Sequence, residues 1–346
     1  MSNSGSHPSR LGRYVLAERI GHGAMGDVYA GVDDVGRAVA VRIGISGDLR
    51  VHQQARMTGQ VAHPNVVSVL DLGEDQGRPF VGMERLDGVP LNPAVMALRS
   101  LDARLELMMH ICDGLHAAHE RGVVHGHLKP GHVFITNDGA VKLIDFGAGD
   151  GRPDAYAAPE QVRGGGASTR GDIFSAAAVC YAIATGRAPF ASHAAVVSEQ
   201  PPAIAHSSAP DALSRTLFKG LDKDPARRHQ SVNHLRAEIE QVRRSLRGDV
   251  DRVIKAAVDR YRDIEALVVQ RRALGKRLGL PGIDKDCDAR LARLAAAFPE
   301  FAHGDSNGLG SIDAARASEA LAVLQLVHND VLTEVSVLQA ASGGRR

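Results

Sequence analysis

Tryptophan is absent from this 346-residue chain, and aromatic residues make up only 4% of it. So few aromatic side chains argue against the stacking surfaces on which single-stranded nucleic acids bind. Lys and Arg (41) almost balance Asp and Glu (40), which leaves a formal net charge of +1. No bulk field attracts nucleic acid or an anionic membrane, so we expect no nucleic-acid partner.

Cysteine is also scarce. Cys112, Cys180 and Cys287 lie far apart and form no C-x-x-C pair, which is typical of buried thiols in a reducing compartment. Residues 1–12 are rich in Ser, Gly and Pro and lack the apolar core of a signal peptide. No unbroken apolar run approaches the roughly 20 residues that cross a bilayer. We therefore expect a cytoplasmic protein without a membrane span.

The order of periodic segments predicts two lobes and a further helical part. Short alternating segments over 14–42 predict strands separated by glycines, whereas 101–121 has the spacing of an amphipathic helix. From Ile254 to Val268, apolar residues recur at steps of three and four, as in a helix or a short coiled-coil seam. Further expected elements are helices over 52–61, 291–298 and 311–338, strands over 66–72 and 80–83, and disordered ends over 1–12 and 341–346.

A collinear series of kinase motifs runs through residues 14–243. It comprises G-x-G-x-x-G-x-V at 21–28, V-A-V-R at 39–42, D-F-G at 145–147, A-P-E at 158–160, D-I-F-S at 172–175, T-G-R-A-P-F at 185–190 and K-D-P-A-R-R at 223–228. In this order the chain resembles the bacterial eukaryotic-like (Hanks-type) serine/threonine protein kinases. The resemblance implies an α+β, two-lobed protein-kinase-like fold over 13–245, followed by a C-terminal α-helical module, a bundle or coiled coil, over 246–340.

The resemblance also implies a nucleotide cleft. Arg42 stands where the family has the phosphate-contacting Lys, and a planar guanidinium does not replace an ammonium conservatively. Gln54 stands where that Lys has its Glu partner, so the ion pair becomes a hydrogen bond to a neutral group. The implied nucleotide contacts, with Met83 as gatekeeper, are Gly21, Gly23, Gly26, Val28, Ala40, Arg42, Met83, Glu84, Leu86, Phe134 and Asp145.

The catalytic loop departs most from the family pattern. Where the family has H-R-D-x-K-P-x-N, this chain has H-G-H-L-K-P-G-H at 125–132. His127 replaces the Asp that accepts the substrate proton, His132 replaces the Asn that holds a second Mg²⁺, and Lys129 is retained. Asp145 keeps one Mg²⁺ ligand. Two His and one Asp also resemble a facial triad for a transition metal, although simple filling of vacated polar sites is the plainer interpretation.

The motifs for regulatory phosphorylation are missing, whereas the motifs that hold the larger lobe together are present. Only ten residues separate Gly147 from the A-P-E motif, and none is Ser or Thr, so the usual regulatory phosphorylation has no acceptor there. Pro153 replaces the Thr that bridges the catalytic Asp and Lys. The scaffold is kept: the resemblance implies that Asp172 braces the catalytic-loop backbone and that Arg228 pairs with Glu160.

These changes predict a catalytically impaired homologue, a pseudokinase. A positioned base contributes about 10²–10⁴ in rate, and no working catalytic residue is expected here. We expect a binding scaffold or allosteric regulator, with ATP left open as a ligand and Mg²⁺ weak or absent. The alternative is an active or atypical serine/threonine kinase that uses ATP with His127, His132 and Asp145 at the reaction centre.

The expected partner is another protein, such as an active kinase or other signalling component. It would dock through the C-terminal helices or the kinase lobes. The sequence leaves a homo-oligomer open, and it leaves open whether those helices pack on the kinase-like domain instead.

Overall fold

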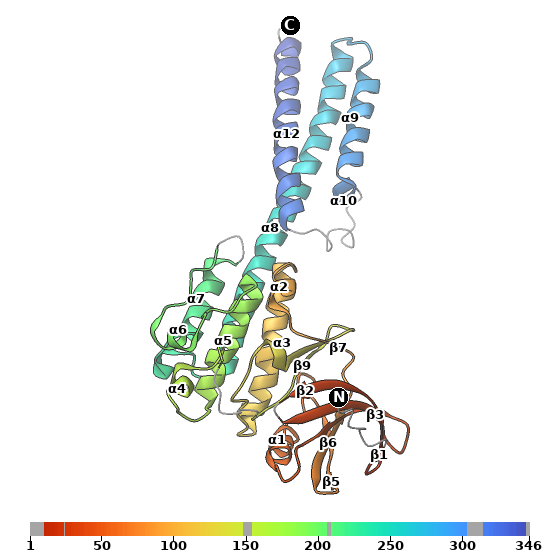
Figure 1. The fold of residues 1–346 in the computed structure, drawn as a ribbon. Coiled ribbons are helices and arrows are strands. Elements are labelled where there is room, and N and C mark those ends of the chain that lie inside the picture. Colours follow the sequence, from red (N-terminus) through yellow and green to blue (C-terminus); the bar gives the residue numbers. More distant parts are fainter. Residues whose placement is uncertain (1–9, 24, 148–153, 206–208, 303–313, 344–346) are drawn as a thin grey trace, which may run out of the picture. The chain divides into compact units, whose positions relative to one another are not determined.

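The computed structural model describes residues 10–23, 25–147, 154–205, 209–302 and 314–343. The chain divides into two compact units, residues 1–243 and 244–346, and each is described by itself. In the first unit, strands β1–β6 and helix α1 form one lobe, and helices α2–α7 form the other (Figure 1). This is the two-lobed fold that the sequence predicts.

An antiparallel sheet of six strands, in the order β1-β2-β3-β4-β6-β5, builds the smaller lobe. Alternation along β4 buries Val39 and Val41 completely, and it places Ala40 and Arg42 on the side that lines a cleft. Helix α1 packs on β5 and β6. The elements of this lobe are β1 (Arg10–Leu11), β2 (Tyr14–Gly23), β3 (Gly26–Val32), β4 (Ala38–Ile43), α1 (Arg50–Thr58), β5 (Val69–Asp75) and β6 (Arg78–Glu84).

The N-terminal boundary differs from the expectation. Residues 10–12 were expected in a disordered end, but β1 pairs with β2 through Arg10–Val15 and Leu11–Tyr14. Leu11 is only 1% exposed, so burial of its side chain holds the short strand in place. Residues 1–9 lie outside the described residues.

The larger lobe is built around α5, which is buried around almost its whole circumference. Ser100 caps α3 and Ser168 caps α5 by accepting backbone N–H bonds. A small sheet in the order β7-β8-β9 carries the catalytic-loop region. The elements are β7 (Gly88–Pro90), α2 (Pro93–Met96), α3 (Leu101–Glu120), β8 (Val133–Thr136), β9 (Val141–Leu143), α4 (Pro159–Val162), α5 (Thr169–Thr185), α6 (His193–Ser198) and α7 (Asp211–Gly220), with 3₁₀ turns at Pro130–His132 and Pro225–Arg227.

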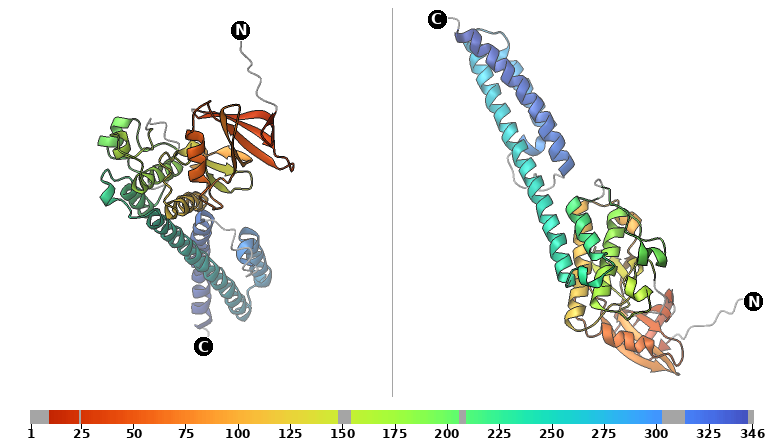
Figure 2. Two further views of the ribbon diagram at one scale, coloured as in Figure 1. Left: turned by 90° about the horizontal axis from the view of Figure 1, so that it is seen from below. Right: turned by 90° about the vertical axis from the view of Figure 1, so that its left-hand side faces the viewer.

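Helix α8 (Val232–Arg277) contributes to both units and is unbroken over 46 residues (Figure 2). The expected domain boundary at 245/246 therefore falls inside a helix, and the helix begins well before Ile254. Leu235 and Ile239 are buried in its first part, and Tyr261 and Ile264 in its second. No proline interrupts this stretch, so nothing in the backbone forces a break.

The second unit is a helical bundle of α8, α9 (Ile283–Ala297), α10 (Pro299–Ala302) and α12 (Ala314–Gly343). Its apolar core includes Tyr261, Ile264, Cys287, Leu324 and Val331. Helix α12 continues through residues expected in the disordered tail, 341–343, while 344–346 and the start of the helix expected over 311–338 lie outside the described residues.

Helix α12 is long and apolar enough to cross a membrane by length and composition. Its qualifying segment, Ala315–Ser342, has a mean hydropathy of 1.3 in its most apolar window. The helix qualifies although it holds no unbroken apolar run of that length, because averaging over 18 residues tolerates scattered polar residues. The absence of a membrane span stays a prediction. The same criterion is met by core helices of soluble proteins, and Ala320, Leu324, Val331 and Val335 lie in the core of this bundle.

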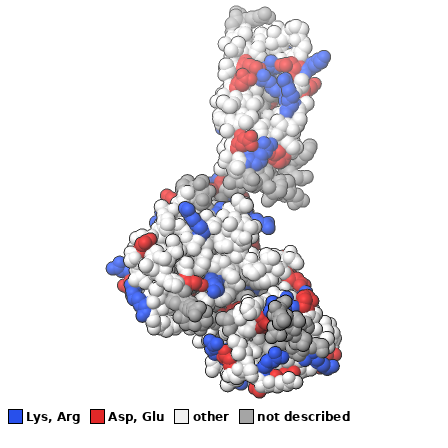
Figure 3. Space-filling view, in the orientation of Figure 1, with Lys and Arg blue, Asp and Glu red and all other residues white. Residues whose placement is uncertain are grey.

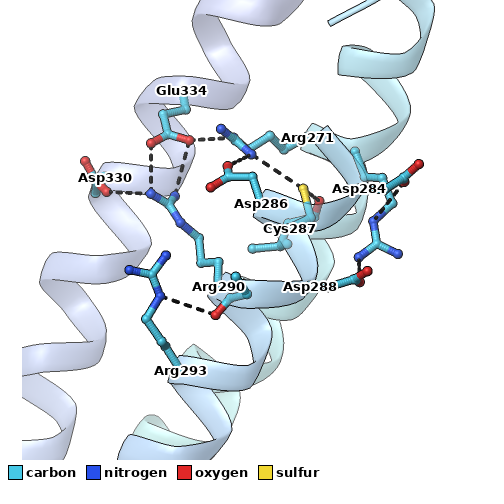
Figure 4. Close-up of polar contacts among 12 residues, drawn as sticks. Arg271, Asp284, Asp286, Cys287, Asp288, Arg290, Arg293, Asp330 and Glu334 are labelled. Carbon is cyan, nitrogen blue, oxygen red and sulfur yellow. Dashed lines mark hydrogen bonds and ion pairs between the residues drawn. The ribbon is translucent and has the colours of Figure 1, made fainter. Parts of the chain in front are cut away.

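Ion pairs connect the three long helices of the bundle (Figure 4). Glu334 on α12 lies 2.5 Å from Nε of Arg271 on α8 and 3.0 Å from Nη2 of Arg290 on α9. Arg271 also contacts Asp286, at 2.7 Å. One carboxylate thus links both partner helices, which favours one register of α12 over its alternatives.

Replacing Glu334 by Gln is expected to weaken α12 locally by about 1 kcal/mol, because the two pairs are partly screened by solvent. Amide hydrogen exchange of the full chain should then be about fivefold faster in α12. The control Glu319→Gln, on the same helix and 69% exposed, should leave exchange unchanged. Equal exchange in the two variants would contradict a role of Glu334 in joining the helices.

Candidate functional site

A cleft of about 920 Å³ in the first unit is lined by residues from both of its lobes. All eleven residues expected to contact a nucleotide line it. They are Gly21, Gly23, Gly26, Val28, Ala40, Arg42, Met83, Glu84, Leu86, Phe134 and Asp145. The structure therefore brings the predicted positions together in one place, and their contacts with a ligand stay a prediction.

The glycine loop is a hairpin between β2 and β3, in which Gly23 pairs with Gly26. Gly26 has φ of +115°, and a Cβ atom there would lie 1.9 Å from the carbonyl oxygen of Ile43. Only glycine fits such a conformation and such a contact. Gly26 therefore allows the hairpin to turn tightly against the end of β4, and the hairpin lines the cleft.

The other end of the cleft is apolar. Ala40 and Met83 face each other across β4 and β6 as register partners, and both line the cleft. Met83, Arg42 and Asp145 also line a neighbouring cavity of about 20 Å³. The Glu84 carboxylate accepts from the Ser68 N–H and the Lys142 ammonium, both at 2.7 Å, so this side chain fixes the end of β6.

Arg42 joins both lobes at the bottom of the cleft. Its Nη1 lies 2.7 Å from Oδ1 of Asp145 and donates to Oε1 of Gln54 at 3.2 Å. The expected hydrogen bond between Arg42 and Gln54 is confirmed. Burial raises the pKa of Asp145, but the Arg42 guanidinium outweighs burial and leaves that pKa below the usual carboxyl range.

Asp154 is a site residue that the sequence did not reveal. Its Oδ2 lies 3.2 Å from Nε2 of His127 and 3.5 Å from the Lys129 ammonium. Burial raises the pKa of Asp154, whereas the hydrogen bond with His127 lowers it, and the balance is a lowered pKa. A carboxylate from the segment before A-P-E thus faces the position from which the family's Asp is missing. In the sequence, only one observation indicated that a carboxylate is needed here: Lys129 is retained although the family's neighbouring catalytic Asp is replaced by His127.

His132 is held by the catalytic loop itself. Its Nδ1 lies 2.7 Å from the carbonyl oxygen of His127. A carbonyl only accepts, so Nδ1 carries the proton and the neutral ring leaves Nε2 without one. Nε2 lies 3.9 Å from Oδ2 of Asp145. Burial lowers the pKa of His132, which favours this neutral form.

The scaffold predicted from the motifs is in place. Asp172 accepts from the backbone N–H groups of His125 and Gly126, both at 2.8 Å, and contacts Nε2 of His119 at 2.7 Å. His125 is fully buried, and its ring lies 4.6 Å from that of Phe146. The loop that carries His127 and His132 is therefore rigidly placed, although His119 was not recognised as part of this brace.

The transition-metal triad stays a prediction. Among the residues that the structure describes, no group of three His, Cys, Asp or Glu side chains is arranged to hold a metal ion. The three side chains have other contacts: Asp145 with Arg42, His127 with Asp154, and His132 with a backbone carbonyl.

Comparisons with known proteins decide the family. Residues 14–231 match the protein kinase domain family. The chain belongs to the protein kinases, among the bacterial serine/threonine kinases. It is 33% identical to the serine/threonine-protein kinase Pkn1 of Myxococcus xanthus over 64% of this chain and 37% of Pkn1. It is 30% identical to PknB of Mycobacterium tuberculosis over 68% of this chain and 44% of PknB.

Solved structures show the same kinase fold. The kinase domain of PknI from Mycobacterium tuberculosis matches 67% of this chain and 96% of the PknI chain, with a TM-score of 0.57 and 24% identity. Rad53 in complex with AMP-PNP matches with a TM-score of 0.57, 24% identity, and coverage of 65% and 64%. This kinase chain spans less than half the length of the curated relatives it matches.

The kinase cleft fits a nucleotide better than it fits Mg²⁺. The cleft has an apolar end, a glycine hairpin and a cation, Arg42, which suit a base and phosphates. Mg²⁺ requires oxygen ligands in near-octahedral geometry. Here Oδ1 of Asp145 is bound by Arg42, and an imidazole, His132, stands at the second metal position. The residues present do not fit Mg²⁺.

Proposed function

We propose that this kinase homologue binds a nucleotide in its cleft, transfers phosphate poorly, and acts as a regulator or scaffold for another protein. One observation carries the impaired chemistry. At the position of the catalytic base stands His127, whose Nε2 lies 3.2 Å from the Asp154 carboxylate and 3.4 Å from the Lys129 ammonium. A protonated Nε2 would face the carboxylate, and an unprotonated Nε2 would accept from the ammonium. In either tautomer this nitrogen is not free to accept a substrate proton.

Phosphate transfer by the wild-type chain is expected to be at least about 10³-fold slower than by a kinase with an intact catalytic loop. Loss of a positioned base accounts for about 10²–10⁴ of rate, and the changed metal site acts in the same direction. The measurement is transfer from radiolabelled ATP to the chain itself and to a generic protein substrate, with Mg²⁺ or Mn²⁺. Robust transfer that Asp145→Ala abolishes would overturn the proposal.

The alternative is an active serine/threonine kinase. The names of the relatives favour it. So does one tautomer of His127: if Nε2 donates to Asp154, the carboxylate orients the ring and Nδ1 keeps a lone pair with which to act as a general base. Asp154→Asn distinguishes the two. In an active kinase it should lower transfer more than tenfold, whereas in the impaired homologue it should leave a background rate unchanged.

The regulatory role requires a protein partner. On the face seen in Figure 3, basic and acidic side chains are mixed over each unit, which favours a protein partner over nucleic acid. We place the chain in the cytoplasm and assign docking to the helical unit or the kinase lobes. Light scattering of the full chain, alone and with a kinase relative from the same cells, measures self-association and partner binding. If the chain is a monomer and binds none of the kinase relatives tested, the proposed regulatory role would be contradicted.

A further inference from the structure

Arg42 contacts Asp145, the residue to which the family resemblance assigns a metal. Arg42 lies on β4 and Asp145 on the segment after β9, and their Nη1 and Oδ1 atoms are 2.7 Å apart. Both side chains line the cleft and are mostly buried, at 14% and 17% exposed. A buried carboxylate needs a cation beside it, and here the protein itself supplies one.

The charges around the phosphate end have changed together. By the family resemblance, an intact site has Lys, Glu, Asp, Lys, Asn and Asp, which sum to −1. This chain has Arg42, Gln54, His127, Lys129, His132 and Asp145 at those positions. With neutral imidazoles, they sum to +1, and the Asp154 carboxylate beside His127 and Lys129 brings the sum to 0. The site is therefore one charge more positive than the intact site, and the cation beside Asp145 is Arg42.

The geometry lets a guanidinium act as a bridge. The contacts of Arg42 with Asp145 and with Gln54 both involve Nη1. A guanidinium presents its donors in a rigid planar fork that matches phosphate oxygens. Arg42 can therefore hold Asp145 with one nitrogen and a phosphate with the others. A Lys at this position has a single charged nitrogen with which to do so.

We propose that Arg42 replaces Mg²⁺ as the cation between Asp145 and the nucleotide phosphates, so that the cleft takes a nucleoside triphosphate in its metal-free form. This inference rests on the proposed nucleotide binding. The ligand is then ATP without a bound metal, and Arg42 is the residue that selects this form.

Calorimetric titration of the full-length wild-type chain with ATP tests this directly, once with EDTA and once with excess Mg²⁺. The affinity in EDTA is expected to equal or exceed that in Mg²⁺. Binding that needs Mg²⁺ by tenfold or more would overturn the metal-free form and leave nucleotide binding standing. Absence of binding in both conditions would overturn this inference and the nucleotide part of the proposed function together.

Two variants separate the bridge from general electrostatics. Arg42→Lys keeps the charge but loses the fork, and its affinity in EDTA should fall at least tenfold. Asp145→Asn removes the negative charge beside Arg42, so binding in EDTA should be retained or strengthened. Binding through a metal held by Asp145, by contrast, would be lost in Mg²⁺ in this variant. Arg37→Lys, whose partner Asp33 lies outside the cleft, is the matched control.

Each variant is first checked by its circular dichroism spectrum and by its melting temperature without ligand. If Arg42→Lys is too unstable to titrate, Asp145→Asn still decides the question. Unchanged affinity in Arg42→Lys, or lost affinity in Asp145→Asn, would contradict the bridge.

Discussion

Replacing Arg228 by Ala is expected to lower the free energy of unfolding of the first unit by about 3–5 kcal/mol, because it leaves a carboxylate without its buried cation. Arg228 is 0% exposed at its side chain and forms a two-pronged pair with Glu160, at 2.7 and 2.8 Å. It also donates to the carbonyl oxygens of Asp222 and Arg170, both at 2.8 Å. One side chain thus ties A-P-E to the segment before α8.

The neighbouring residue offers a matched control. Arg227 is 75% exposed at its side chain, and its pair with Asp224 is long, at 3.8 Å, so Arg227→Ala should cost less than about 0.5 kcal/mol. Urea unfolding of both variants, followed by tyrosine fluorescence and circular dichroism, measures the difference. If the two variants unfold at the same urea concentration, the pair contributes no more than a surface contact does.

Acidification from about pH 6.5 to pH 4 is expected to destabilise the first unit by about 3 kcal/mol through His125 alone. Burial lowers the pKa of His125 to about 4, from an ordinary value of 6.5. Between these two values the unfolded chain binds a proton that the folded chain does not, so stability falls as the pH falls. Each unit of pKa difference corresponds to about 1.4 kcal/mol.

Two other histidines and two carboxylates also make the stability of the first unit depend on pH. Burial also lowers the pKa of His132 and of His229, which adds to the loss below pH 6.5. The lowered pKa values of Asp145 and Asp154 act differently. Their stabilisation is complete above the ordinary carboxyl pKa of about 4 and is lost only below it.

Unfolding midpoints in urea at pH 7, 6, 5 and 4.5 give the dependence. His125→Asn should flatten the curve between pH 6.5 and 4.5 while lowering stability at pH 7, because its ring packs on Phe146. His116→Asn is the control, since His116 lies on the partly exposed side of α3. A wild-type midpoint that does not change with pH in this range would contradict a neutral buried His125.

The fold was predictable because many individually weak sequence patterns indicate the same two-lobed architecture. Alternation over 14–42, the spacing over 101–121 and the scaffold motifs each gave the correct element, and the Glu160–Arg228 and Asp172 contacts were confirmed. Element ends were less predictable. The short strand at Arg10–Leu11 depends on tertiary burial of Leu11, and the unbroken course of α8 depends on packing along its whole length.

The candidate site was predictable wherever a motif fixed the position. The cleft residues and the Arg42–Gln54 hydrogen bond follow from the resemblance to the kinases at matching motif positions. Asp154 and His119 did not follow, because they act on residues that are 25 or more positions away and belong to no motif. The contacts of the three residues considered as a metal triad were not predictable either. The family resemblance places Asp145, His127 and His132 near one another, but it does not reveal that Asp145 contacts Arg42 or that His132 contacts a backbone carbonyl.

Met83 stands beside both the cleft and the about 20 Å³ cavity next to it. Shortening this side chain to alanine would join the two spaces and create a hole behind the expected position of the nucleotide base. If the cleft binds a nucleotide as proposed, the enlarged space is expected to admit an analogue with a bulky apolar group on its base, which the wild-type chain excludes. Binding of such an analogue to the Met83→Ala variant would allow the consequences of ligand binding to be followed independently of any phosphate transfer.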